Sequence, residues 1–284
     1  MIDIVLAKNA GFCFGVRRAI ELVDKTLEQN NDKVYSLGPV IHNEFVLDKL
    51  AKKGLKIIDK SDLTNIFNST IVIRSHGVEK NIYEIIDKNN NKIVDLTCPF
   101  VKKIHKLVEK YADLGKYIIV IGDPNHAEVQ AIISYANNDI SVISSKEDIN
   151  GLKIPENQEI VVLFQTTANI EKSKKLVDIL TNLFYNKCLV VNTICNATID
   201  RQNEVNEISK NVDSMIIIGS KQSSNTKKLY DVSKVNCDNT YLINDVSELS
   251  KIKNIKNQKV GISAGASTPD DLIEEIVSNA RTKF

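Results

Sequence analysis

Three of the five cysteines in this 284-residue chain follow short apolar stretches, and each is followed at once by sequence typical of a helix. They are Cys13 after IDIVLAKNAGF, Cys98 after KIVDLT and Cys195 after LVVNTI. The start of a helix favours the thiolate, which is the form of cysteine that binds metal. A lone cysteine of this kind is more often buried and inert. Three in equivalent positions indicate a metal site.

The spacing of the cysteines restricts the kind of metal site. No two have the close spacing of a zinc finger, a thioredoxin-like motif or a bacterial ferredoxin run, so distant segments must assemble the site. Three protein ligands suit a cubane iron-sulfur cluster in which one iron stays free for a substrate. Cys188 and Cys237 lie outside the pattern, at a strand start and in a polar loop, and we interpret both as structural or incidental.

Three of the four histidines, His42, His76 and His126, lie in loops just past apolar strands. Histidines clustered in loops at strand ends are usually binding or catalytic groups. The fourth, His105, lies among lysines in VKKIHKLVEK, and we predict a surface position for it.

Hydroxyl and amide side chains open two predicted helices in the last third of the chain. Ser223, Ser224 and Asn225 occur in SKQSSNTKK, and Ser267 and Thr268 occur in SAGASTPDD. Each group is typical of a helix cap and also of a phosphate cradle. Together with the histidines they favour a diphosphate site.

Glu128 and Thr166 are further candidates, in NHAEV and FQTT. A carboxyl group in a pocket shared with a cluster and an anion should have a raised pKa, because burial and like charge both disfavour its ionised form. Glu128 is therefore a candidate proton donor. The alternative is an ordinary glutamate at a helix start.

The elements that position these residues alternate between short Ile- and Val-rich runs and longer amphipathic stretches, which is typical of parallel α/β units. Each of the three cysteines is followed, at similar spacings, by the same order of strands and polar loops. The pattern predicts three pseudo-symmetric small α/β domains with mostly parallel sheets around a central iron-sulfur site. Their expected bounds are 14–97, 98–191 and 192–284, with the N-terminal strand 1–13 joined to the third.

Charge and hydropathy exclude several classes of partner. There are 37 basic and 36 acidic side chains, so nothing global draws the protein to nucleic acid or to a lipid surface. No run reaches the ~20 apolar residues that span a bilayer, and the first residues read as a strand and not a signal peptide. We expect a cytoplasmic protein with reduced thiols.

The order of motifs resembles one family over almost the whole chain, from Ala7 to about Glu275. The chain is similar to 4-hydroxy-3-methylbut-2-enyl diphosphate reductases, the last enzymes of the non-mevalonate isoprenoid pathway. The matching motifs are GFCFGVRRAI, GPVIHNEFV, RSHGV, DLTCPFV, NHAEV, QTT, NTICNATIDRQ, GSKQSSNTKKL and SAGASTPD.

The resemblance implies an iron-sulfur oxidoreductase that converts its allylic diphosphate substrate to isopentenyl and dimethylallyl diphosphates. It implies that Cys13, Cys98 and Cys195 hold one 4Fe-4S cluster with one open iron. It further implies a catalytic network around the substrate hydroxyl and an electron donor such as flavodoxin or ferredoxin. The implied catalytic residues are Glu128, Thr166 and His126; the implied diphosphate ligands are His42, His76, Ser223, Ser224, Asn225 and Ser267. Gln165 and Thr167 flank the network without an assigned role.

Two other functions remain open at this point. A cluster-dependent hydro-lyase would eliminate water without an external reductant. An iron-sulfur sensor would bind without turnover, although a sensor has no need of the proton donors beside the free iron.

Overall fold

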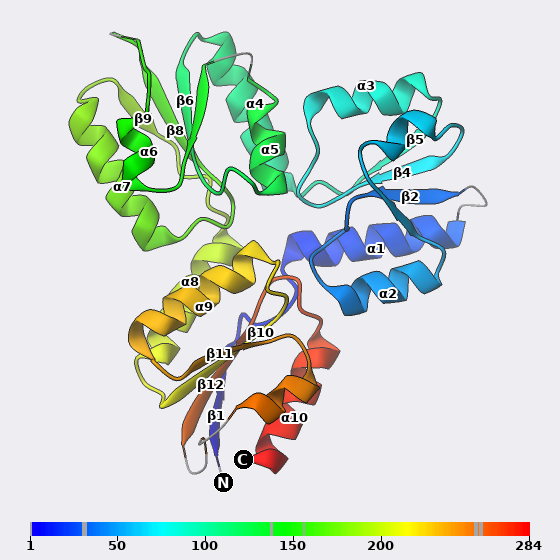
Figure 1. Cartoon of the computed structure of the whole chain (residues 1–284), viewed down its shortest axis with the longest axis vertical. Helices are drawn as coiled ribbons and strands as arrows, with labels where there is room; N and C mark the ends of the chain where they lie inside the picture. Colours follow the sequence, from blue (N-terminus) through cyan, green and yellow to red (C-terminus); the bar gives the residue numbers. More distant parts are fainter. Residues whose placement is uncertain (1, 30–32, 137–138, 156, 253–254, 256–257) are drawn as a thin grey trace. The chain divides into compact units, whose positions relative to one another are not determined.

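Three parallel four-stranded sheets form the framework of the computed structural model, which describes residues 2–29, 33–136, 139–155, 157–252, 255 and 258–284 (Figure 1). All strand pairs in these residues are parallel. The predicted α/β class with three small sheets is confirmed. Met1, the first residue of the predicted N-terminal strand, lies outside the described residues.

The first sheet has the strand order β3-β2-β4-β5. Its central strand β4 reads TIVI and is buried along its whole length, as expected for a parallel strand covered on both faces. The strands are β2 (Val34–Leu37), β3 (Lys56–Ile58), β4 (Thr70–Ile73) and β5 (Lys92–Asp95). The helices in this part of the chain are α1 (Phe14–Gln29), α2 (Glu44–Lys52), the 3-10 helix η1 (Asp62–Asn65) and α3 (Lys80–Lys88).

The second sheet has the order β7-β6-β8-β9, and both of its central strands are buried throughout. Its strands are β6 (Tyr117–Ile121), β7 (Ile140–Ile143), β8 (Ile160–Phe164) and β9 (Cys188–Val190). The helices around it are α4 (Pro99–Asp113), α5 (Ala127–Ile133), α6 (Lys146–Asn150) and α7 (Ile170–Leu183).

The third sheet has the order β1-β12-β10-β11, so the N-terminal strand pairs with the last strand of the chain. Its strands are β1 (Asp3–Leu6), β10 (Ser214–Ile218), β11 (Thr240–Ile243) and β12 (Lys259–Ala264). The helices around it are α8 (Asn196–Ser209), α9 (Ser224–Asn236), the 3-10 helix η2 (Val246–Lys251) and α10 (Asp270–Lys283).

The three sheets share one topology. In the first sheet β2, the first strand in chain order, pairs with β3 and β4, and β5, the fourth, pairs with β4 at the edge. In the second sheet β6 pairs in the same way with β7 and β8, and β9 pairs with β8. In the third sheet β10, β11 and β12 take the first three places and β1 takes the fourth. A candidate cysteine follows every fourth-place strand, as the predicted repeat requires.

Each candidate cysteine links an edge strand to a helix. Cys98 follows β5 of the first sheet and precedes α4, whose Ile104 and Val108 pack against the second sheet. Cys195 follows β9 of the second sheet and precedes α8, whose Val205 packs against β10. Pro99 supplies the restricted backbone angle that suits a first helical position.

By compactness the chain divides into two units. The first unit carries the third sheet and the second unit carries the other two sheets. The first unit comprises Met1–Arg18, Ile41–Leu50 and Asn196–Phe284, and the second comprises Ala19–Val40 and Ala51–Cys195. The three predicted domain bounds follow the sheets and stay a prediction.

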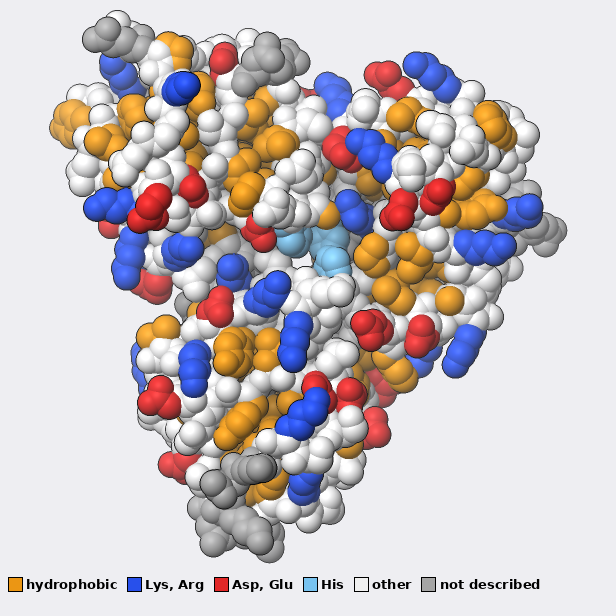
Figure 2. Space-filling model, in the orientation of Figure 1, with side chains coloured by type: hydrophobic (Ala, Val, Ile, Leu, Met, Phe, Trp, Pro, Cys, Tyr) orange, Lys and Arg blue, Asp and Glu red, His pale blue; other side chains and the backbone are white. Residues whose placement is uncertain are grey.

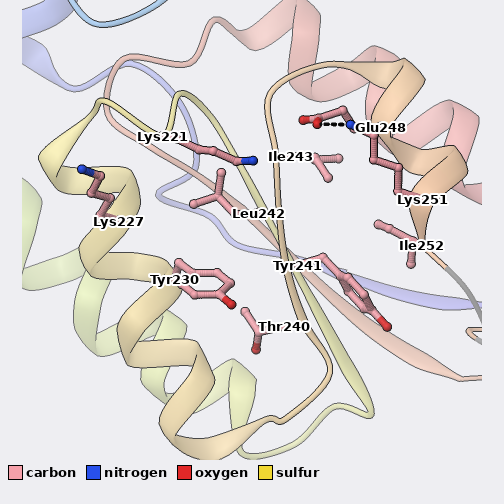
Figure 3. A pocket seen from close by; sticks show the side chains of 10 residues that line it. All are labelled: Lys221, Lys227, Tyr230, Thr240, Tyr241, Leu242, Ile243, Glu248, Lys251 and Ile252. Carbon is pink, nitrogen blue, oxygen red and sulfur yellow. Dashed lines mark hydrogen bonds and ion pairs between the residues drawn. The ribbon is translucent and has the colours of Figure 1, made fainter.

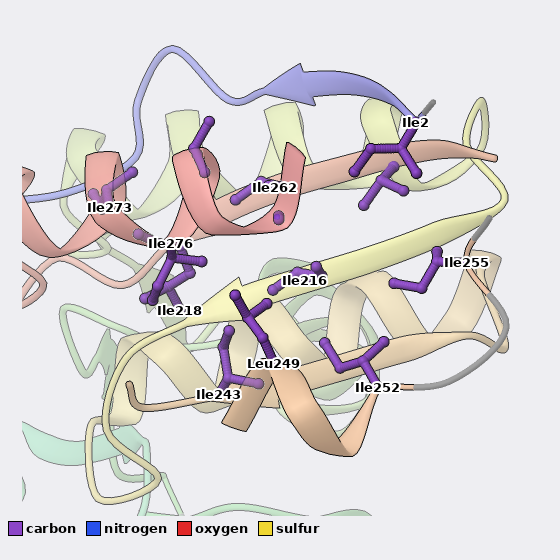
Figure 4. Close-up of a cluster of buried hydrophobic side chains, with 14 residues drawn as sticks. Ile2, Ile216, Ile218, Ile243, Leu249, Ile252, Ile255, Ile262, Ile273 and Ile276 are labelled. Carbon is purple, nitrogen blue, oxygen red and sulfur yellow. The ribbon is translucent and has the colours of Figure 1, made fainter. Parts of the chain in front are cut away.

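Aliphatic side chains fill the interior of each unit. In the first unit Ile216 and Ile218 of β10 pack with Leu249 and with Ile273 and Ile276 of α10 (Figure 4). Burying such a side chain contributes about 1.5 to 3 kcal/mol, so this layer holds α10 and η2 on the sheet.

Charged side chains of both signs are interspersed over the described surface on the face shown in Figure 2. That distribution agrees with the net charge of +1. No helix among the described residues is long and apolar enough to cross a membrane.

Candidate functional site

The three candidate cysteines make the same backbone contact. The N–H of Cys13 donates to the carbonyl of Ala266 at 3.3 Å, that of Cys98 to Ser75 at 3.0 Å and that of Cys195 to Thr166 at 3.1 Å. Each acceptor lies just past the third-place strand of the same sheet. The hydrogen bond therefore fixes each cysteine beside the loop that carries a predicted ligand.

Two residues that sequence reasoning missed hold the loop before Cys13. The buried Arg201 of α8 donates to the carbonyl of Gly11 at 2.7 Å. The carboxylate of Glu204 accepts from the backbone N–H groups of Lys8 at 2.6 Å and Asn9 at 2.9 Å. Arg201 and Glu204 are three positions apart and so share one face of the helix. That spacing is visible in the sequence, but it does not identify the loop that they bind.

Ser75 connects the backbone at Cys98 to the loop that follows β2. Its hydroxyl donates to the carbonyl of Val40 at 3.1 Å, while its own carbonyl accepts from Cys98. Asp95 accepts from the N–H of Thr97 and pairs with Lys102 at 2.7 Å. The residues on both sides of Cys98 are thus held by polar contacts within the second unit.

Glu128 and Thr166 form a buried pair, 2% and 6% exposed. One carboxylate oxygen of Glu128 accepts from the N–H of Thr166 and the other from its hydroxyl, both at 2.7 Å. Burial raises the pKa of Glu128, while the two hydrogen bonds from Thr166 act in the opposite direction. The geometry suits proton exchange between the carboxyl group and the threonine hydroxyl.

His126 is the cap of α5 and lies next to Glu128. Its Nδ1 accepts from the N–H of Glu128 at 3.1 Å, so the neutral ring carries its proton on Nε2. The ring meets that of His76 edge to face, with centroids 5.2 Å apart. The structure therefore brings together four predicted residues of the second unit: His76, His126, Glu128 and Thr166.

Gln165, for which we predicted no role, is 2% exposed. Its Oε1 accepts from the N–H of Asp123 at 3.0 Å, which links the strand ends of β6 and β8. It positions the loop before His126.

The hydroxyl-rich loops lie at the predicted helix starts in the first unit. Ser223 caps α9, and its hydroxyl accepts from the N–H of Thr226 at 3.3 Å. Asn225 is 5% exposed, and its Nδ2 has no hydrogen-bond partner within the described part of the chain. Ser224 is the first residue of α9. An unpartnered buried donor at the start of a helix is suited to an anion.

His42 and Ser267 come together in the same unit. The Ser267 hydroxyl donates to the carbonyl of His42 at 3.2 Å. Pro269 caps α10, as the sequence predicts for a helix that starts near this residue. The order of motifs does not reveal this link between two distant loops.

The predicted surface position of His105 is wrong. The side chain is 4% exposed, and its ring stacks on that of Tyr135 with centroids 4.1 Å apart. Burial lowers the pKa of His105 to about 4, so the ring is neutral at physiological pH. The prediction is based on the lysines beside His105 in the sequence. In the structure His105 lies on the apolar face of α4 with Val101, Ile104 and Val108.

The other two cysteines differ from one another. Cys188 begins β9 as predicted, and burial raises the pKa of its thiol. Cys237 directly follows α9, at the start of the predicted loop, but its side chain is buried against Val205 and Leu229 and so belongs to the core. All five cysteines lie among the described residues, and none of them forms a disulfide bond.

An open groove of about 530 Å³ lies between α9, β11 and η2 in the first unit (Figure 3). The groove is lined by three lysines and two tyrosines, which are Lys221, Lys227, Lys251, Tyr230 and Tyr241. Lys251 pairs with Glu248 at 2.6 Å. The groove contains none of the predicted site residues.

The fold and these contacts define an α/β protein in which a thiol recurs at one topological position of three sheets. A buried carboxyl group and polar loops accompany the thiols. The chain matches the family model described as LytB protein over residues 4–281, and it belongs to that family.

Relatives of known name match over nearly full length. The 4-hydroxy-3-methylbut-2-enyl diphosphate reductase of Clostridioides difficile (strain 630) is 42% identical over 289 residues, covering 98% of each chain. That of Thermoanaerobacter sp. (strain X514) is 40% identical over 283 residues, covering 99% of this chain and 97% of the relative. The family resemblance seen in the motifs is confirmed.

Two solved structures match over the same length. The E-1-hydroxy-2-methyl-but-2-enyl-4-diphosphate reductase of Plasmodium falciparum has a TM-score of 0.92 at 32% identity, covering 98% of this chain and 87% of that chain. A structure titled as (E)-4-hydroxy-3-methyl-but-2-enyl diphosphate reductase, the terminal enzyme of the non-mevalonate pathway, has a TM-score of 0.71 at 38% identity. It covers 99% of this chain and 100% of that chain.

Proposed function

We propose that this protein reduces 4-hydroxy-3-methylbut-2-enyl diphosphate to isopentenyl and dimethylallyl diphosphates, the last step of the non-mevalonate pathway. The observation that carries the proposal is the repeated contact of Cys13, Cys98 and Cys195 with the loop beside each, in a chain whose full-length relatives bear this name. In the reaction the allylic alcohol takes up two electrons and two protons and loses water.

Cys13, Cys98 and Cys195 would hold one 4Fe-4S cluster with one open iron. The donor set fits iron, because all three are partly exposed thiols that form no disulfide bond. When bound, the cluster supplies a Lewis acid for the substrate oxygen and a path for electrons, which no side chain provides. Arg201 and Glu204 support the Cys13 loop, while the carbonyls of Ser75 and Thr166 hold the backbone of Cys98 and Cys195, so each ligand is held before metal binds.

The diphosphate would bind to neutral donors and histidines. In the first unit the helix start of α9 offers backbone N–H groups and the unpartnered amide of Asn225. Anchoring the diphosphate away from the reacting carbon fixes the pose of the substrate. The full proposed set is His42, His76, Ser223, Ser224, Asn225 and Ser267.

Glu128, Thr166 and His126 would handle the proton at the substrate hydroxyl. Because burial raises the pKa of Glu128, its carboxyl group stays protonated up to a higher pH than a glutamate in water. A protonated Glu128 can donate to the Thr166 hydroxyl, and that hydroxyl can donate onward to the departing oxygen. His126 offers an Nε2 proton beside the same pair.

Electrons would come from a small redox protein such as flavodoxin or ferredoxin. We also propose that the enzyme works in the cytoplasm, where reducing conditions keep its five thiols out of disulfide bonds.

The test is anaerobic turnover of the cluster-reconstituted protein with the substrate and a chemical reductant, following products and electrons together. We expect five-carbon diphosphates at two electrons each. Dehydration without electron uptake would identify a hydro-lyase instead. A loaded cluster that binds substrate without any product would identify a sensor, and either result would reject the proposal.

A further inference from the structure

Three helices of the second unit each begin close after a candidate site residue. α3 begins at Lys80, just past the loop that carries His76. α4 begins directly after Cys98, and α5 begins directly after His126. Whatever fixes these three helices relative to one another also fixes the three site residues.

Polar contacts join the three helices at one junction. The N–H of Lys80 at the start of α3 donates to the hydroxyl of Ser134 at the end of α5, at 3.0 Å. The ammonium group of Lys80 pairs with Glu109 of α4 at 2.7 Å, although both side chains are substantially exposed. An exposed ion pair contributes little. The buried centre of the junction must therefore do most of the fixing.

That centre is His105 of α4, stacked on Tyr135, which directly follows Ser134. The two rings are 15° from parallel and His105 is 4% exposed. Its Nε2 has no hydrogen-bond partner among the residues that the structure describes. A buried imidazole without a partner for one nitrogen is costly compared with an apolar side chain of similar shape. At this junction His105 therefore acts through the contacts of its ring and not through a hydrogen bond from Nε2.

His105 also touches the turn that carries His76. A Cβ placed on Gly77 would lie 2.9 Å from Cε1 of His105 and 3.3 Å from Cγ2 of Thr97. Gly77 has φ of +76°, which L side chains rarely adopt. The backbone next to His76 therefore rests directly on the imidazole ring.

We propose that His105 is a positioning residue for the diphosphate site, holding His76 through Gly77 while it locks α4 onto α5. The inference rests on the proposed function, because it assigns to His76 a diphosphate ligand role. His105 itself touches no substrate. Its ring determines the place of the His76 turn, and Tyr135 determines the place of the ring.

The experiment compares three variants of the cluster-loaded protein. His105→Ala removes the ring, His105→Phe keeps a flat ring against Tyr135, and Val108→Ala is the matched control. Val108 is fully buried one turn further along α4 and packs on the second sheet, so its truncation opens a cavity in the same helix. KM and kcat are measured under anaerobic turnover, and binding of inorganic diphosphate is measured by calorimetry without turnover.

A positioning role predicts a shift in binding. For His105→Ala we expect KM and the diphosphate Kd to rise about tenfold with kcat changed less than about twofold. His105→Phe should restore both constants, and Val108→Ala should leave both unchanged despite its cavity. If His105→Ala does not fold, Tyr135→Leu, which removes the stacking partner, should raise both constants in the same direction.

The possible failures can be told apart. If the wild-type protein binds diphosphate but forms no reduced product, the proposed function fails whatever the variants do. If the wild type turns over and His105→Ala keeps the wild-type KM and Kd, the inference alone is overturned. The inference is also overturned if Val108→Ala shifts KM as much as His105→Ala, or if the wild type binds no diphosphate at all.

Discussion

The loops of the second and third sheets follow one strand order but carry different chemistry. In the second sheet they carry groups that can exchange a proton, Glu128 and His126, of which the carboxyl group is almost fully buried. At the place that matches His126 the third sheet carries Ser223, which stays neutral at physiological pH, while Ser267 matches Thr166 of the second sheet. The proposed roles therefore divide between two sheets that share one topology.

The division has a physical reason. A buried carboxyl group holds its proton more tightly than one in water, and this suits a proton donor. Hydroxyl and amide groups at a helix start can accept an anion without any change of charge. The comparison predicts that variants at Glu128 and His126 alter the rate of the chemical step, and that variants at Ser223 and Ser267 alter substrate affinity.

Glu128→Gln should have the largest effect. We expect kcat to fall about 10²- to 10⁴-fold, because the amide cannot donate the proton that the departing hydroxyl needs. KM should stay within about twofold, since the amide keeps the shape of the side chain, accepts from the N–H of Thr166 through its oxygen and can donate to the Thr166 hydroxyl through its NH2 group. Steady-state kinetics with equal cluster content measures both, with the exposed Glu171→Gln as control. Near-normal turnover would remove Glu128 from the mechanism.

Gly265→Ala should unfold the third-sheet loops at lower denaturant concentration. A Cβ at this position would collide with the side-chain hydroxyl of Thr226 and lie 3.1 Å from its Cβ. We expect a loss of about 3 kcal/mol in the free energy of unfolding. Adding Thr226→Ala should recover part of it. Gly151→Ala, where the new Cβ meets only ordinary contacts, is the control, and equal losses in both variants would contradict the packing argument.

His105 makes the second unit sensitive to acid. Its pKa is lowered from 6.5 to about 4 by burial, so the unfolded chain binds a proton that the native state excludes. Stability from this group is complete above pH 6.5 and is lost as pH falls toward 4. Between pH 7.5 and pH 5 the wild type should lose about 2 kcal/mol more than His105→Phe. Urea titrations at the two pH values measure the difference, and parallel losses would show that His105 is protonated in the native state.

Ser223→Ala tests the smallest effect. Loss of the α9 cap should cost about 1 kcal/mol of stability, and loss of an anion donor should raise KM several-fold. Ser145 caps α6 in the second unit with a complete capping box, so Ser145→Ala is a matched control. It should lose similar stability and keep the wild-type KM. A KM that rises equally in both variants would mean that the Ser223 effect comes from stability alone.

The sequence predicts the sheets well because continuous Ile and Val runs leave few alternatives to buried parallel strands. The cysteine positions are predicted from the repeated order of elements, since each cysteine lies between a strand and a helix. His105 is missed because its lysine neighbours occupy the other faces of the helix. The contacts of Arg201 with Gly11 and of Ser267 with His42 join segments far apart in the chain, and local patterns carry no information on them.

The pairing of β1 with β12 bears on how the protein is made. During synthesis β1 is made long before its partner strand β12 and before Ala266, the acceptor for Cys13. Contacts between residues so far apart in the sequence form late, because bringing them together closes a long loop at a cost in chain entropy. Cys98 and Cys195 find their backbone partners from nearby segments much sooner. If Cys13, Cys98 and Cys195 hold a cluster as proposed, its full set of three ligands should be in place only after β12 has been translated.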